Sequence, residues 1–404
     1  MRPARTTALA GLVALVLVGC AGSGAAGGHG AARPTTTTTG SGADAPVVAG
    51  SGAAVDPIPL TAAACLARAP GQVSVIQGAV PSQTRVDAPA DDTTFDARTA
   101  TYTGDDTIDP TTGQPDIYPM LFGKQQPASG LCVIGPTVPG SIAASMTWPQ
   151  LKAERPQPSG RKIYYDAAAL TEFARGAAGH LVDGLRVDDV SDGVAARGSY
   201  TVTRTLPPDG GNFYLQDAYF TNVRDDCVDV NDFISGIVYD SLFDGCYTGI
   251  SERPDQGSPL LGHAAAPGDQ LVLDHVLLRM QGFPGPHPTA QCPAGTPTGY
   301  NEIFKWSAGA NQPVIRHAVF LLDAPPCSTK YFPFPRNASL QDVTIVWTGA
   351  GPWRWSRPPG VRITTNPAVW TSARATWLRR HGCTVTTGAI AATANTCTRL
   401  VAPT

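Results

Sequence analysis

Charge is scarce in this sequence. Of its 404 residues 15% are charged, only 5 are Lys, and the formal net charge is −3. Because no basic cluster occurs, the sequence lacks the electrostatic footprint of a nucleic-acid-binding protein, and we expect no nucleic-acid partner. Beyond the N-terminal segment no apolar run is long enough to cross a bilayer as a helix, so we predict no further membrane span.

Other absences narrow the fold class. The 9 cysteines include no Cys-x-x-Cys motif and no His is spaced as a zinc partner, which argues against a metal–thiolate site. The 42% hydrophobic content is too high for a wholly disordered chain, and the 43 Gly and 37 Pro are too many for a helical bundle. The composition favours an all-β protein with many short strands and loops.

Residues 1–20 have the organisation of an export signal. Arg2 and Arg5 form a positively charged start, and residues 8–18 form an apolar stretch too short to span a membrane. The segment ends in the letters LVGC at Cys20, which resemble the lipobox of bacterial lipoproteins. This resemblance implies that Cys20 carries the lipid and anchors an exported protein to the outer side of a bacterial cell membrane.

Two alternatives to the lipid anchor stay open: an ordinary secretory signal with an incidental Cys, and an uncleaved anchor. Residues 21–57 are almost all Ala, Gly, Ser and Thr, with few large apolar residues. Such a segment cannot bury a core, so we predict a flexible tether between the lipid and the folded part.

The middle of the chain contains a repeat. Segments at 185–194, 218–227 and 237–246 can be aligned, each with a period-2 apolar pattern followed by polar residues and an Asp. Short strands repeated about every 20 residues, with insertions, predict stacked parallel strands in a right-handed parallel β-helix. The alternative is chance alternation in a β-sandwich. We assign 58–350 to this β-helix, with clearer coils at 180–350.

The early part of this region, 58–161, reads as irregular first coils, and the alternative is a separate domain. At the other end, 351–404 is predicted to form a C-terminal cap. Asn366-Pro367 and the spacing of Trp370 and Trp377 predict a helix at about 367–381, which we expect to cover the end of the coil stack.

The exported context and an even set of cysteines predict up to four disulfides. Cys227 and Cys246 fall at equivalent positions of neighbouring coils in our alignment, so we predict that they are bonded. Cys383 and Cys397 are expected to close a C-terminal loop. Pairing among the remaining four stays open: Cys65, Cys132, Cys292 and Cys327.

The same alignment places Asp192, Asp225 and Asp244 in one ladder, with Asp226 beside it. Stacked carboxylates repel, so either one of them has a raised pKa or a cation lies nearby. This arrangement suits acid–base chemistry or Ca²⁺ binding. The alternative is that the Asp residues cap turns, because Asp accepts local backbone N–H bonds.

Three segments resemble the coils of pectin-lyase-like β-helices, in particular polygalacturonase-type glycoside hydrolases: SDGV at 191–194, RDDC at 224–227 and CYTGIS at 246–251. The resemblance implies that Asp226 is the general acid, that Asp192 and Asp225 activate water, and that Cys227 pairs with Cys246. Arg279 would then bind the substrate. Thr248 stands where the family has a His, and Gln281 where it has a Lys.

Two function classes follow. The first is a surface-anchored enzyme, hydrolase or lyase, that cleaves a polysaccharide; the second is a non-catalytic glycan-binding or structural protein of the cell envelope. We expect a monomer without a required cofactor. His275 and His317, at equivalent positions, are interpreted as turn residues, Phe304-Lys305-Trp306 as packing, and Trp353 with Trp355 as a cover of the coil end.

Overall fold

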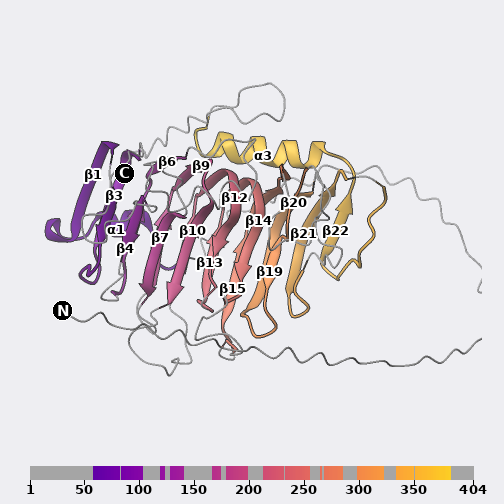
Figure 1. The fold of residues 1–404 in the computed structure, drawn as a ribbon, viewed down its shortest axis with the longest axis horizontal. Coiled ribbons are helices and arrows are strands. Elements are labelled where there is room, and N and C mark those ends of the chain that lie inside the picture. The colour runs from indigo at the N-terminus through magenta and orange to yellow at the C-terminus, as the bar shows by residue number, and fades with distance from the viewer. Residues whose placement is uncertain are drawn as a thin grey trace, which may run out of the picture. The chain divides into compact units, whose positions relative to one another are not determined.

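The computed structural model describes residues 58–81, 83–102, 119–122, 128–140, 166–173, 179–198, 213–231, 233–254, 264–265, 268–284, 298–322, 334–349 and 351–383. All of them belong to the compact unit Pro46–Thr404. The described part is all-β, with nearly all of its strands in one large sheet (Figure 1). Its elements are α1 (Ala62–Leu66), a 3-10 turn η1 (Pro70–Gln72), β1 (Val73–Val80), β2 (Thr84–Val86), β3 (Thr94–Tyr102), β4 (Met120–Phe122), β5 (Cys132–Ile134), β6 (Thr137–Pro139), β7 (Asp166–Phe173), β8 (His180–Asp183), β9 (Arg186–Asp188), β10 (Asp192–Gly198), β11 (Phe213–Gln216), β12 (Tyr219–Asp229), β13 (Gly236–Tyr239), β14 (Leu242–Glu252), β15 (Gln270–Asp274), β16 (Leu277–Met280), β17 (Phe283–Pro284), β18 (Thr298–Gly299), β19 (Phe304–Trp306), β20 (Gln312–Leu322), β21 (Ser339–Trp347), β22 (Val361–Thr364) and α3 (Ala368–Arg380).

The parallel strands pair in three columns. The first column runs through β5, β8, β11, β13, β15 and the start of β20. The second runs through β6, β9, the start of β12, the start of β14, β16 and the end of β20. The third runs through β4, β7, β10, the end of β12, the end of β14 and β19. The chain visits the columns in this order repeatedly, which is compatible with a β-helix.

One residue in the left-handed conformation forms each corner between the first and second columns. Its N–H donates to the carbonyl of the following coil, as Asp240 N does to Asp274 O at 3.0 Å and His275 N to Arg316 O at 3.2 Å. Gly, Asp, Asn and His enter this backbone region more readily than other residues. The corner column, which is defined by positive φ in register, consists of Gly135, Gly184, Asp217, Asp240, His275, His317 and Asp342.

The core lies between the columns and is built from stacked apolar ladders. In the second column, Phe220 of β12 pairs with Val187 of β9 and with Phe243 of β14, and all three are at most 4% exposed. The rings of Phe220 and Phe243 lie 5.0 Å apart. Because an alternating strand places every second side chain on one face, each coil adds another layer to the same core.

The strand predictions are confirmed at the coarse level and wrong in one register. β1 to β6, within 58–161, belong to the same large sheet as the later strands. Leu242, which we aligned with Val223, instead pairs with Tyr219, and Val223 pairs with Cys246. Our alignment was displaced by four residues, because alternating apolar residues match equally well at every even displacement. The bulge between Val223 and Asp226 follows this stretch and shifts the pairing by one further residue.

The helix α3 lies along the side of the strand columns and not at their end, which corrects our expectation for its place. It begins after Asn366, whose side chain accepts a hydrogen bond from Ala368 N at 3.0 Å. Figure 1 shows it running across the edges of successive strands. Its apolar side packs on one residue from each of five strands. The buried cluster comprises Tyr219, Leu242, Leu277, Leu321, Val346, Trp370, Trp377, Leu378 and Cys383. No described helix is long and apolar enough to cross a membrane.

The C-terminal end of α3 is held by charge. His381 Nε2 lies 3.0 Å from Asp217 Oδ1 and 3.5 Å from Asp240 Oδ2, and Arg380 also forms an ion pair with Asp240. Burial alone would lower the pKa of His381, but hydrogen bonds and attraction to the two carboxylates outweigh it and raise the pKa to about 9.

Stability should therefore depend on pH through His381. The pKa of His381 in the folded protein lies above the unfolded value of about 6.5. Below pH 6.5 the charged imidazole therefore contributes fully to the free energy of unfolding, and this contribution is lost as the pH rises through 9. We predict that His381→Gln lowers the free energy of unfolding by about 3 kcal/mol near pH 6 and by little near pH 10. Urea unfolding of both proteins at the two pH values measures this. An equal difference at both would show that the charge plays no part.

Candidate functional site

Three carboxylates predicted from the sequence meet on neighbouring strands. One oxygen each of Asp192, Asp225 and Asp226 lies within 4.8 Å of the others. Asp192 begins β10, and the other two lie in β12, where Asp226 pairs with Thr248 of β14. All three are largely buried, at 2%, 9% and 3% exposed. We call this group, together with Lys305, the carboxylate–lysine cluster.

The bulge in β12 brings these side chains together. Asp225 N donates to Ser191 O at 2.7 Å, and Asp226 N donates to the Asp192 carboxylate at 2.8 Å. The backbone of 225–226 is thus hydrogen-bonded to the preceding coil at the point where the regular pairing of β12 with β14 is interrupted. Bulges often redirect side chains in this way beside functional sites.

Lys305 of β19 supplies the charge partner of the cluster. Its Nζ lies 2.9 Å from Asp226 Oδ2, and its side chain is 15% exposed. Burial would lower the pKa of Lys305, but the carboxylates of Asp226, Asp225 and Asp229 outweigh this and raise it well above its usual value. The ammonium is therefore charged at any physiological pH.

Two further observations mark the cluster as unusual. Asp226 Oδ1 is buried and has no hydrogen-bond partner among the described residues. Nearby, burial raises the pKa of Glu302, against the attraction of Arg253 and Lys305. A buried oxygen without a partner and a perturbed carboxyl in one place are typical of functional sites, although ion-pair networks in structural roles produce them too.

The predicted disulfide Cys227–Cys246 is present and adjoins the cluster, since Cys227 follows Asp226 directly. It joins β12 to β14 and so fixes the strand that carries two of the carboxylates. A second disulfide, Cys65–Cys132, joins α1 to β5 and was left open by the sequence. Cys383 is disulfide-bonded; Cys397, its predicted partner, lies outside the described residues, as do Cys20 and the whole of 1–57.

Arg279 and Asp244 belong to a different place. Asp244 pairs in register with Thr221 and Arg279, not with the other carboxylates, so the predicted ladder of Asp192, Asp225 and Asp244 is wrong. Arg279 Nε lies 2.6 Å from Asp244 Oδ1, and Arg374 of α3 contacts the other oxygen. Burial would raise the pKa of Asp244, but these two cations outweigh it and lower the pKa.

This rearrangement changes two sequence predictions. Lys305, and not Arg279, is the cation that contacts Asp226 of the cluster. Arg279 forms its ion pair with Asp244 instead. The predicted Ca²⁺ ladder loses Asp244, and the group that could hold a metal ion is Asp192, Asp225 and Asp226. Here the Lys305 ammonium already balances part of the negative charge.

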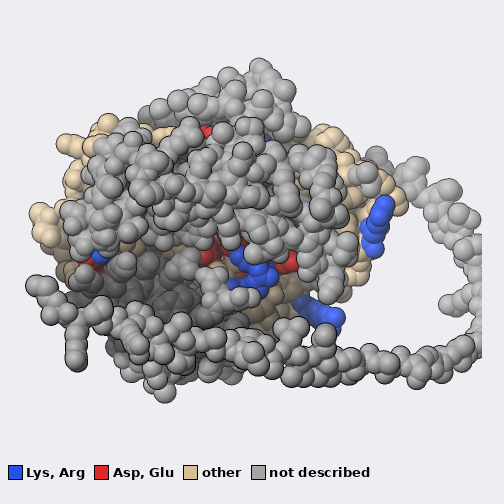
Figure 2. Space-filling view, viewed as in Figure 1, with Lys and Arg blue, Asp and Glu red and all other residues tan. Residues whose placement is uncertain are grey.

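The remaining sequence candidates have structural surroundings. The rings of Trp353 and Trp355 pack edge-to-face on each other and on Trp347, beside the core. Arg224, which precedes Asp225 in the sequence, packs over the ring of Phe283 at 4.0 Å. On the face drawn in Figure 2, blue and red atoms of the described residues adjoin each other near the centre, and further blue groups lie singly on the right.

No family model, no curated protein and no solved structure matches the chain. The site therefore has to be argued from its own geometry.

Proposed function

We propose that the chain is an exported right-handed parallel β-helix protein that acts on a polysaccharide through the carboxylate–lysine cluster. The observation that carries this proposal is the convergence of Asp192, Asp225 and Asp226 within 4.8 Å, beside a buried Lys. Carboxylates at this spacing can hold a water molecule between them and exchange a proton with a bound hydroxyl or glycosidic oxygen.

In the proposed reaction Asp192 and Asp225 position the water, and Asp226 protonates the leaving oxygen. A proton donor must carry its proton before the reaction, whereas Asp226 forms an ion pair with Lys305 in the free protein. A polysaccharide group that accepts a hydrogen bond from Lys305 would release Asp226 next to two other carboxylates. Their mutual repulsion then favours protonation of one of the three.

The second candidate is a non-catalytic glycan-binding or structural protein of the envelope. Two observations favour it: each carboxylate is at most 9% exposed, and Lys305 already satisfies one of them. Buried ion pairs of this kind also occur in proteins where their role is to select one arrangement of the core, without any part in catalysis.

A cleavage screen separates the two candidates. The detergent-solubilised full-length chain is incubated with neutral and acidic polysaccharides, and new reducing ends and product masses are measured. Hydrolysis adds one water per cleaved bond, whereas a lyase leaves an unsaturated sugar without adding water. Cleavage that Asp226→Asn abolishes and Asp342→Asn retains supports the enzyme. Binding without cleavage across the panel supports the second candidate.

We also propose that Cys20 carries the lipid. Cys20→Ala is expected to stop incorporation of labelled fatty acid and to move the protein from the membrane fraction to the soluble fraction. Labelling of the variant at the level of the native chain would refute the anchor.

A further inference from the structure

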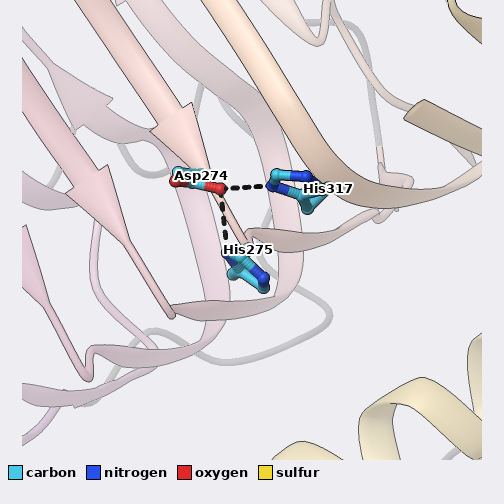
Figure 3. Close-up of side chains that lie close together, drawn as sticks. All are labelled: Asp274, His275 and His317. Carbon is cyan, nitrogen blue, oxygen red and sulfur yellow. Dashed lines mark hydrogen bonds and ion pairs between the residues drawn. The ribbon is translucent and has the colours of Figure 1, made fainter. Parts of the chain in front are cut away.

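The corner column carries two histidines that face one carboxylate. His275 and His317 occupy equivalent corners of consecutive coils, and their rings lie 4.7 Å apart. Asp274 Oδ1 lies 2.8 Å from His275 Nδ1 and 2.9 Å from His317 Nδ1 (Figure 3). The three ligand atoms all lie within 4.8 Å of one another. None of these residues belongs to the carboxylate–lysine cluster.

We propose that Asp274, His275 and His317 bind a zinc ion. Zn²⁺ favours imidazole nitrogen and carboxylate oxygen, at about 2.0–2.2 Å, in a tetrahedron. Such bonds place neighbouring ligand atoms about 3.4 Å apart. Asp274 Oδ1 therefore needs to move away from each imidazole nitrogen by only about half an ångström to admit the ion.

The surroundings hold the ligands in place. Arg316 Nε donates to Asp274 Oδ2 at 2.8 Å, which orients the carboxylate and leaves its other oxygen for the metal. The left-handed corner fixes the backbone of both histidines, with φ of 56° and 51°. The corner alone explains why His is tolerated at each position. It does not explain why both rings face the same carboxylate oxygen.

The site is open to solvent on one side. The side chain of His317 is 36% exposed and that of His275 is 16% exposed. His317 also lines a hollow beside α3, together with Asp342, Thr344, Val369 and Ala373. Three protein ligands and an accessible side leave the fourth tetrahedral position for water, as in zinc sites that exchange ligands. The two nitrogen donors favour Zn²⁺ over Ca²⁺ or Mg²⁺, which prefer oxygen.

The proposal is tested by calorimetry. The untagged full-length chain is first stripped of metal with a chelator, and its affinity for zinc is then measured by titration. His317→Asn and His275→Asn remove one ligand each, and Asn is compatible with the left-handed corner. We expect each to weaken zinc binding at least about tenfold, because loss of an outer-shell partner alone costs 10–100-fold. Asp92→Asn, also at a left-handed residue, serves as the control and should bind as the native chain does.

A second readout guards against misfolded variants. Zinc should raise the melting temperature of the native chain and of Asp92→Asn, and should leave the two His variants unchanged, since a ligand stabilises only a fold that binds it. Native-like affinity in both His variants, or loss of binding in His381→Gln instead, would overturn the assignment. So would a native chain that binds no zinc.

Discussion

Replacing Lys305 by Met is expected to lower the free energy of unfolding by about 3–5 kcal/mol near neutral pH. The substitution keeps much of the side-chain volume but removes the cation that faces Asp226. Three carboxylates, each at most 9% exposed, then remain together without the Lys305 ammonium. Burial and mutual repulsion both disfavour their charged forms, which is why a change of one residue should have so large an effect.

Two controls identify the charge as the cause. Adding Asp226→Asn to Lys305→Met removes one unbalanced carboxylate and should recover part of the lost stability. Lowering the pH toward 4 should also narrow the gap between native and variant, because protonation removes the repulsion. The comparison is made by urea unfolding of the three proteins. A loss that is unchanged in the double variant and independent of pH would mean that Lys305 acts through packing alone.

Trp377→Ala is expected to lower the free energy of unfolding by about 3–5 kcal/mol, the usual range for removing a large buried ring. Trp377 is 2% exposed, its Nε1 donates to Asp240 O at 3.0 Å, and its ring stacks on His381 at 3.9 Å. Hydrogen exchange along α3 and urea unfolding both report the effect.

Arg379 provides the matched control on the same helix. Arg379 is exposed, and within the described part of the chain its side chain donates a hydrogen bond to Thr376 of the same helix. Arg379→Ala should therefore change the free energy of unfolding by less than about 0.5 kcal/mol. If Trp377→Ala behaved like Arg379→Ala, the packing of α3 on the strand columns would contribute nothing to stability.

The sequence predicted what depends on local pattern. Alternating apolar residues indicated parallel strands, and the turn chemistry around Asn366 indicated α3. The pair Cys227–Cys246 was found because the two residues lie on adjacent coils, where even an approximate register brings them near. Asp192, Asp225 and Asp226 were found for the same reason, since two of them are consecutive and the third is one coil away.

What the sequence could not predict depends on exact register and on distant segments. Alternating apolar residues match equally well at every even displacement, and our alignment was displaced by four residues, so Asp244 pairs with Thr221 and not with Asp225. Lys305 reaches Asp226 across a sequence separation of 79, and Arg374 reaches Asp244 across 130. One signal pointed to Lys305: it is one of only 5 Lys in the chain and lies between two aromatic residues of a strand.

The two imidazoles of the zinc proposal show a related limit. Their equivalent positions were visible in the sequence and were interpreted as turn residues. The left-handed φ at both corners agrees with that interpretation. Only the side-chain geometry shows that Asp274 faces both rings, because the direction of a side chain at a corner does not follow from strand alternation.

Glycan binding by the Asp226→Asn variant tests the central claim most directly. The native chain, Asp226→Asn and the control Asp342→Asn are compared on a glycan array, and the affinity for the best ligand is then measured by calorimetry. If the carboxylate–lysine cluster is the site, Asp226→Asn should change affinity at least about tenfold, which corresponds to about 1.4 kcal/mol, while Asp342→Asn binds like the native chain. Equal affinity of all three proteins for the same glycan would contradict the account.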